Sequence, residues 1–325
     1  MWGPLQRHNL GSSERKAFNL LFLIFFGTNF FWNTSFGLTP NLAAKLNRLA
    51  STSEARVGIT FVDLKTGQKI SINGSQPFPT ASVIKVAVAL AAFHFSDSGK
   101  LDLNQRVLFQ ESDKLGGAGV LRWMKAGREY SLWNLLRLMI TLSDNTATRL
   151  AINAIGLENI NAYIQQMGLK ITIIKDSTML VEPPDSHTNF STPDEMAQIL
   201  WMIYHHRGLS QKSSKQLIAW MNYQRYRWGI WRGLPPGTYV ANKTGHLEGI
   251  TNDAGIICTK KGNYILSIFT WGFKKTRTAR RLINEISRVV YEDYTGEKVV
   301  RPKINAKRKL RLRSPKTPKH RLEPS

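Results

Sequence analysis

Runs with the alternating pattern of β-strands lie near both ends of this chain, and a long stretch of helical pattern separates them. Residues 56–64 and 68–73 alternate apolar and polar side chains around a glycine-bearing turn, which predicts a hairpin. Beyond the Pro-Pro-Gly segment at 235–237, three more runs alternate in the same way, at residues 238–243, 253–259 and 264–271. The simplest assembly is one antiparallel sheet built from both ends of the chain.

The stretch between these strands has mostly helical periodicity from Leu101 to about Gln224. Its clearest amphipathic helices are at residues 132–140 and 194–204, and further helices are expected at 39–50 and 276–291. We therefore predict an α+β fold, in which helices flank the antiparallel sheet and an all-helical domain is inserted into it. The sheet part would comprise residues 39–80 and 225–295, and the helical part residues 81–224.

Two end segments flank this expected domain of residues 39–295. In residues 1–38, Arg7, Arg15 and Lys16 precede an apolar run, which indicates either an export signal or an uncleaved membrane anchor. Both interpretations predict export to the periplasm, the cell envelope or the exterior. Residues 296–325 form a basic tail, in which ten Lys or Arg residues and no acid lie between Arg301 and Arg321. Prolines interrupt this run, so we expect the tail to be disordered.

The formal net charge of +23 is unevenly distributed, and the basic tail carries much of it. The tail could contact anionic lipid or wall polymer, and a solvated tail without a specific partner is an equal alternative. No aromatic residue interleaves with its charges, so we expect no specific nucleic acid partner. The histidines lack the spacing of metal ligands, so no metal or cofactor is predicted. Cys258 is the single cysteine and is expected in the core, and we expect a monomer.

The apolar run at residues 79–95 contains a serine and a lysine three positions apart. Its composition predicts a buried helix, with Thr80 or Ser82 as the cap. Ser82 and Lys85 would then share one helix face, with the ammonium group near the hydroxyl. Burial disfavours the charged form of a lysine, so Lys85 could accept a proton from Ser82, as an activated nucleophile requires. Taken alone, the pair is more often a cap followed by a lysine that reaches solvent.

Two other short stretches carry groups that could serve such a nucleophile. Ser143 and Asn145 lie where an apolar helix stops, so the serine could relay a proton and the amide could hold a substrate carbonyl. The sequence N-K-T-G-H at 242–246 lies on a predicted strand, where the Lys243 ammonium and the Thr244 hydroxyl could bind a carboxylate. A helix terminus and a hairpin turn are the ordinary interpretations of these two stretches.

A third stretch, residues 179–193, is rich in proline and has no periodicity. Glu182 precedes two prolines there, so it belongs to a shaped loop that could hold a carboxylate near a water molecule. A solvated surface glutamate is the alternative.

In this order and spacing, the stretches resemble the class A β-lactamase group of the serine β-lactamase and penicillin-binding-protein superfamily, from about residue 40 to 292. The motifs that carry the resemblance are S-V-I-K at 82–85, S-D-N at 143–145, the E-P loop at 182, K-T-G at 243–245 and the following T-N-D-A-G-I-I. The resemblance implies a hydrolase that opens β-lactam rings through an acyl-enzyme on Ser82.

The resemblance also implies a role for each matching residue. The catalytic set is Ser82 as nucleophile, Lys85 as its proton partner, Ser143 as proton donor to the leaving nitrogen, and Glu182 as the activator of the hydrolytic water. The substrate-binding set is Asn145 for the acyl side chain, Lys243, Thr244 and Gly245 for the carboxylate, and His246, whose main-chain N–H would complete an oxyanion hole with that of Ser82.

The chain departs from the family pattern after Glu182. Position 186 is serine where the family has an asparagine that helps hold the water, and the loop reaches Thr192-Pro193 early. Deacylation is therefore the step in question. Two alternatives follow: a D,D-peptidase or related penicillin-binding protein that acts on peptidoglycan peptides, and a membrane-anchored β-lactam sensor that deacylates slowly.

Overall fold

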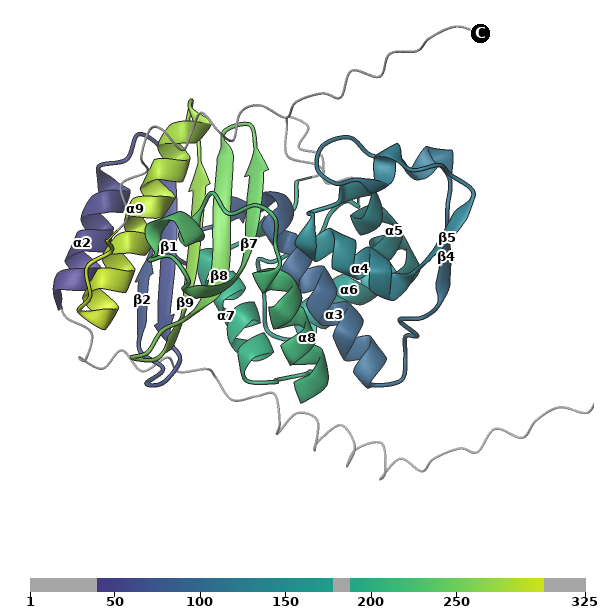
Figure 1. The fold of residues 1–325 in the computed structure, drawn as a ribbon, viewed down its shortest axis with the longest axis horizontal. Coiled ribbons are helices and arrows are strands. Elements are labelled where there is room, and N and C mark those ends of the chain that lie inside the picture. The colour runs from purple at the N-terminus through teal and green to yellow at the C-terminus, as the bar shows by residue number, and fades with distance from the viewer. Residues whose placement is uncertain (1–39, 178–187, 301–325) are drawn as a thin grey trace, which may run out of the picture.

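A five-stranded antiparallel sheet forms the centre of the molecule, in the order β2-β1-β9-β8-β7 (Figure 1). The computed structural model describes residues 40–177 and 188–300. The strands are β1 (Arg56–Asp63), β2 (Lys69–Ile72), β7 (Tyr239–Leu247), β8 (Ile250–Cys258) and β9 (Asn263–Trp271). Because β1 pairs with β9 along its whole length, the two ends of the chain share one sheet, which confirms the prediction.

Each face of the sheet lies against its own hydrophobic core, so its strands are apolar on both sides. The helices α2 (Pro40–Ser51) and α9 (Thr276–Thr295) cover one face, at the left in Figure 1. Ile59, Phe61 and Ile268 point into that core, whereas Val62, Ile265 and Phe269 point into the core shared with the helical part. One side of the sheet therefore faces the outer helices, and the other side faces the helical part.

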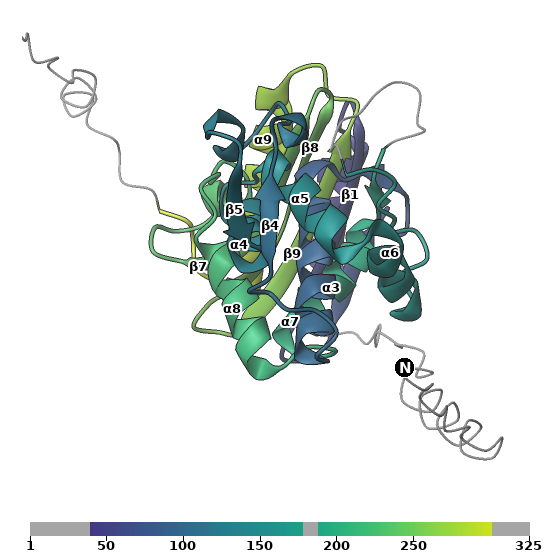
Figure 2. The same ribbon diagram turned by 90° about the vertical axis from the view of Figure 1, so that its right-hand side faces the viewer.

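The helical part surrounds α3 (Lys85–Asp97), whose residues from Lys85 to Phe93 are all buried. A helix that is apolar all round requires neighbours on every side. Figure 2 shows this layer from the side opposite the sheet's outer helices. The neighbours that contact α3 are α4 (Leu132–Thr141), α5 (Asn145–Ile155), α6 (Leu157–Gln166), α7 (Pro193–Tyr204) and α8 (Gln211–Asn222).

Some elements differ from the sequence-based expectation. The helical stretch also contains a hairpin of β4 (Arg106–Phe109) and β5 (Arg128–Ser131), and β3 (Phe78–Pro79) pairs with β6 (Phe190–Ser191). These strands are too short to show a clear period of two. The predicted helix cap is wrong, because a 3₁₀ turn at Ala81–Ile84 precedes α3 and no side chain caps it. The Thr80 hydroxyl instead donates to the Asn189 carbonyl at 3.0 Å.

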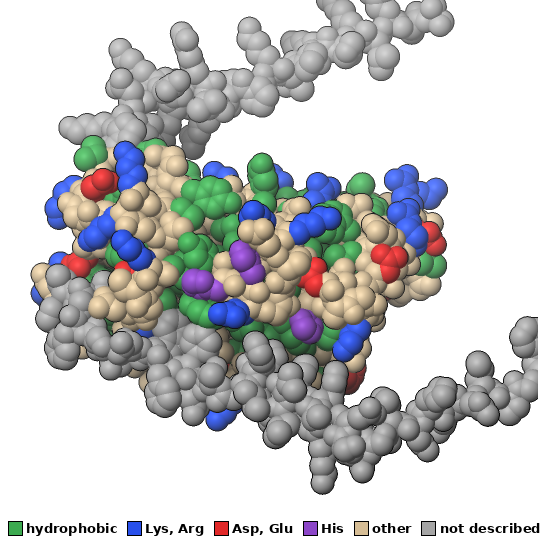
Figure 3. Space-filling model, turned by 90° about the horizontal axis from the view of Figure 1, so that it is seen from below, with side chains coloured by type: hydrophobic (Ala, Val, Ile, Leu, Met, Phe, Trp, Pro, Cys, Tyr) green, Lys and Arg blue, Asp and Glu red, His purple; other side chains and the backbone are tan. Residues whose placement is uncertain are grey.

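The end segments fall largely outside the described residues. The predicted leader or anchor at 1–38 is not covered, and neither is the tail from residue 301. No helix within residues 40–177 and 188–300 is long and apolar enough to cross a membrane. The face in Figure 3 carries Lys and Arg side chains at several separated places among hydrophobic and neutral surface. Cys258, expected in the core, is half-buried at the end of β8.

Candidate active site

Ser82 lies in the 3₁₀ turn that joins β3 to α3. Ala81, just before it, has a φ of 46°, a left-handed conformation that a non-glycine residue adopts only where its surroundings hold it. Two long-range contacts hold the turn: the Thr80 N–H donates to the Asn189 carbonyl at 2.9 Å, and the Asn252 amide on β8 donates to the Pro79 carbonyl at 2.8 Å. The turn is therefore fixed between β6 and β8.

Lys85 is completely buried, and its ammonium group is directed toward the S-D-N segment. Its Nζ atom donates to Asn145 Oδ1 at 2.7 Å, to the Ser143 carbonyl at 2.8 Å and to Ser143 Oγ at 3.4 Å. Burial, and then the nearby charge of Lys243, lower the pKa of Lys85 well below its ordinary value, and Asp144 partly opposes them. These surroundings favour the neutral amine, which can accept a proton.

Ser143 connects the two buried lysines of the site. It follows α4, two residues before α5, and has a φ of 54°. Its Oγ atom accepts a hydrogen bond from Lys243 Nζ at 3.0 Å, in addition to the longer one from Lys85. The hydroxyl therefore lies between an amine on the nucleophile's helix and an amine on the sheet, where it can relay a proton.

Asp144 organises the loop that surrounds the S-D-N segment. It caps α5 by accepting from the Ala147 N–H, and it accepts from the Val120 and Leu121 N–H groups at 2.6 and 2.8 Å. A Cβ atom on Gly119 would lie too close to the Asp144 carboxylate, so only glycine fits there. Gly119 thus allows the backbone to approach Asp144.

Lys243 on β7 is as deeply buried as Lys85. Besides Ser143, its Nζ donates to the Thr244 carbonyl at 2.8 Å and to Gln224 Oε1 at 3.4 Å. Burial lowers the pKa of Lys243 to about 7, and the Asp253 carboxylate partly opposes this effect. Behind it, Asp253 accepts from the Asn242 amide and from the Ile230 N–H, and burial raises the pKa of Asp253 to about 6.

Gly245 and His246 follow on the same strand. A Cβ atom on Gly245 would lie 2.7 Å from the Thr80 carbonyl oxygen and 3.0 Å from the Ser82 nitrogen, so glycine lets β7 pass directly beside the nucleophile turn. His246 Nδ1 contacts the Ile250 carbonyl at 3.0 Å, and its ring lies edge-on to Trp228. Burial lowers the pKa of His246.

Gln224 belongs to the site but carried no signal in the sequence. It follows α8, is 1% exposed, and its amide bonds the backbone and side chain of Thr244. In the sequence it stands inside Y-Q-R-Y-R-W, where neither periodicity nor a known motif distinguishes it from its exposed neighbours.

Glu182 lies outside the described residues, but the residues that flank its segment are described. Asn189 Oδ1 accepts from the Lys175 N–H at 2.8 Å, which joins the two sides of the segment. The main-chain carbonyl of Asn189 is the one that accepts from Thr80. The Asn189 flank therefore contacts the turn that carries Ser82, and the Lys175 flank is bonded to Asn189.

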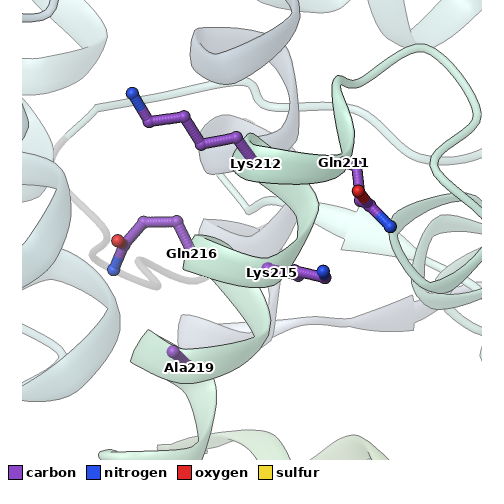
Figure 4. A pocket seen from close by; sticks show the side chains of 5 residues that line it. All are labelled: Gln211, Lys212, Lys215, Gln216 and Ala219. Atoms are coloured by element: carbon purple, nitrogen blue, oxygen red, sulfur yellow. The ribbon is translucent and has the colours of Figure 1, made fainter.

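A shallow hollow on α8 lies apart from this cluster (Figure 4). It contains none of the predicted site residues, and it is lined by Gln211, Lys212, Lys215, Gln216 and Ala219. These side chains include no hydroxyl, thiol or carboxylate. In the described part of the chain, no group of three or more His, Cys, Asp or Glu side chains could hold a metal ion.

Comparisons with known proteins agree with this geometry. A model of the β-lactamase enzyme family matches residues 41–294. The extended-spectrum β-lactamase PER-1 of Pseudomonas aeruginosa is 30% identical over 274 residues, which cover 78% of this chain and 87% of PER-1.

Solved structures show the same relationship. A mutant of PBP-A in an acyl-enzyme complex with penicillin G has a TM-score of 0.74 and 29% identity, covering 80% of this chain and 98% of that one. An ancestral class A β-lactamase has a TM-score of 0.71 and 28% identity, covering 77% of this chain and 99% of that one. The chain therefore belongs to the β-lactamase enzyme family, in its class A group.

Proposed function

We propose that this protein is a serine hydrolase that opens the ring of β-lactam antibiotics through an acyl-enzyme on Ser82. The observation that carries the proposal is the Ser143 hydroxyl, which bonds two fully buried lysines, one on the nucleophile's helix and one on β7. Such a cluster supplies a proton acceptor one helical turn after Ser82 and a proton donor bonded to that acceptor. Its members come from parts of the chain that the fold brings together.

Acylation would begin with attack of Ser82 Oγ on the β-lactam carbonyl carbon. The hydroxyl proton passes to the neutral Lys85 amine, and negative charge develops on the carbonyl oxygen. The main-chain N–H groups of Ser82 and His246 would stabilise that charge, since Gly245 brings β7 beside Ser82. The C–N bond then breaks, and Ser143 gives its proton to the leaving nitrogen while Lys85 returns a proton to Ser143.

Substrate binding would use groups on both sides of Ser143. Asn145 presents its amide beside Lys85, where it would position the acyl side chain of the substrate. Lys243 and Thr244 would hold the substrate carboxylate, with the charge of Lys243 supplying most of the attraction.

Deacylation would require a water molecule activated by the Glu182 carboxylate. Asn189, which follows the Glu182 segment, bonds Thr80, two residues before the acylated serine, and this supports the assignment. The water attacks the ester carbonyl, and its proton goes to Glu182 and then to Ser82 as the ester bond breaks.

A penicillin-binding peptidase is the second candidate function. The early Thr192-Pro193 and the serine at position 186 favour it, because both alter the loop that would hold the hydrolytic water. The similarity to PBP-A, solved as a penicillin G acyl-enzyme, is compatible with it. Export by way of residues 1–38, the domain division and a monomeric state also remain proposals.

Mass spectrometry of single turnovers with a penicillin tests these functions. We expect the full chain to gain the mass of one penicillin and lose it again, Glu182→Gln to keep the adduct, and Ser82→Ala never to form it. If the wild type and Glu182→Gln keep the adduct equally long, the β-lactamase proposal is wrong and a penicillin-binding protein is supported. An adduct on Ser82→Ala would exclude Ser82 as the nucleophile.

A further inference from the structure

The Gln224 amide can adopt only one orientation in this site. Its Nε2 atom donates to the Asn242 carbonyl at 2.8 Å, and its Oε1 atom accepts from the Thr244 N–H at 2.9 Å. A main-chain carbonyl only accepts and a main-chain N–H only donates. Rotating the amide by 180° would place like groups together at both contacts, so two independent bonds fix the oxygen toward Thr244.

This orientation determines the direction of the Thr244 hydroxyl. Thr244 Oγ1 lies 2.7 Å from Gln224 Oε1, and an amide oxygen cannot donate. The hydroxyl proton must therefore point to Gln224, and only the lone pairs of Thr244 Oγ1 remain for other contacts. A carboxylate is also only an acceptor, so it cannot bond this hydroxyl in its present direction.

The ammonium of Lys243 is similarly engaged. It has three protons, and it makes three hydrogen bonds, to Ser143 Oγ, to the Thr244 carbonyl and to Gln224 Oε1. The longest of the three, at 3.4 Å, is the one to Gln224. Gln224 thus accepts from both residues that the proposed function assigns to the substrate carboxylate.

We propose that Gln224 is a positioning residue that competes with the substrate carboxylate for the protons of Thr244 and Lys243. This inference rests on the proposed function. A carboxylate must draw the Thr244 proton away from Gln224 before that hydroxyl can donate to it. Gln224 therefore holds β7 in register with the end of α8 and weakens the preference of the site for anionic substrates over uncharged ones.

The test compares benzylpenicillin with its uncharged methyl ester. The acylation rate constant for each compound is measured with the wild type, Gln224→Met, Thr244→Val and the double variant. The ratio of the two constants, acid over ester, is the readout. Because both constants are measured on one preparation, a partly unfolded variant lowers both equally and leaves the ratio unchanged.

Three results are expected. Thr244→Val alone changes the ratio less than about twofold, because its hydroxyl is held by Gln224. Gln224→Met raises the ratio about fivefold, the value of one freed hydrogen bond. Adding Thr244→Val removes the part of this rise that depends on the hydroxyl, so the ratio falls back toward that of the wild type, and any remainder comes from Lys243. A tenfold fall of the ratio in Thr244→Val alone, or an unchanged ratio in Gln224→Met, would overturn the proposal.

Denaturant unfolding of the same four proteins separates this inference from the proposed function. Each single variant raises the unfolding equilibrium constant by some factor. If the hydrogen bond between Gln224 and Thr244 exists, the constant of the double variant should be about fivefold smaller than the product of the two single factors predicts. Single effects that combine within twofold would refute the hydrogen bond. If no protein is acylated, the proposed function fails, and the unfolding data still decide whether Gln224 holds Thr244.

Discussion

The two lysines that flank Ser143 are equally buried but differ in what lies behind them. Lys85 bonds a hydroxyl, a carbonyl and an amide oxygen, and the positive charge of Lys243 acts on its pKa more strongly than the opposing Asp144 carboxylate. Lys243 is backed by the buried Asp253 carboxylate, which stabilises its charged form. The pKa of Lys85 is lowered well below its ordinary value, and that of Lys243 is lowered to about 7.

This difference assigns two roles, proton acceptor and cation, to two separate lysines, because one buried lysine cannot be neutral and charged at the same time. The surroundings of Lys85 favour the neutral amine, which can take the proton of Ser82, and Lys243 with a pKa of about 7 supplies a cation in part of the molecules at neutral pH. Matched substitutions at the two positions can test this division.

Lys85→Arg is expected to have the largest effect. A guanidinium does not lose its proton in proteins, so it preserves the charge but cannot act as a base. Acylation by penicillin should slow by roughly a hundredfold to ten-thousandfold, the usual contribution of a general base. Stopped-flow acylation, with the melting temperature as a check on folding, measures this. A loss smaller than about tenfold would transfer the role of base to another group, such as Glu182.

Lys243→Arg is expected to change the pH dependence more than the rate. As the pH rises through about 7, wild-type Lys243 loses its proton and the site loses its cation, so acylation should decline by about tenfold per pH unit above that value. The arginine remains charged, so the alkaline decline should disappear up to about pH 9. Acylation rates from pH 5 to 9 provide the measurement, and an identical decline in both proteins would contradict the assigned role.

Asp253→Asn is expected to give the smallest effect on acylation. It removes the charge that raises the pKa of Lys243, so the alkaline decline should move to lower pH by about one unit or less. The same pH series measures this shift. Asn242→Ala should move the decline in the same direction but less far, because the Asn242 amide lowers the pKa of Asp253 and so favours its charged form. A decline that stays at the wild-type pH would show that Asp253 does not act on Lys243.

The same variant should also change how stability depends on pH. Burial raises the pKa of Asp253 in the folded state from 3.8 to about 6, so the folded protein binds the proton more tightly than the unfolded chain. This contribution to stability is complete below about pH 4 and is lost as the pH rises through 6, by up to about 3 kcal/mol. Compared with Asp253→Asn in denaturant unfolding, the wild type should lose stability over that interval.

Most of the fold could be predicted because its strands and helices have clear periods. The pairing of β1 with β9 and the position of K-T-G on β7 follow from alternating apolar runs. The 3₁₀ turn before Lys85 could not be predicted, because long-range bonds to Asn189 and Asn252 determine it and the local sequence favours a helix.

The site was predictable where its residues form motifs and unpredictable where single polar residues join distant elements. Ser82, Lys85, Ser143 and Lys243 have a family spacing, and the fold brings the last three into hydrogen-bond contact. Gln224 has no such spacing, because its partner Thr244 lies 20 residues away on β7. Asp253 belongs to the T-N-D-A-G-I-I motif, but its bond to the Ile230 N–H, 23 residues away, could not be predicted from that motif. Glu182 stays a prediction.

The bond between Asn252 and Pro79 joins residues 173 positions apart, and β1 pairs with β9 over an even longer separation. Contacts of such sequence separation form slowly during folding, because closing a long loop costs entropy before any contact is gained. The nucleophile turn can therefore take its final shape only when the last strand has joined the sheet. In a refolding experiment, penicillin acylation should recover later than helical structure, so the active site itself would report the completion of folding.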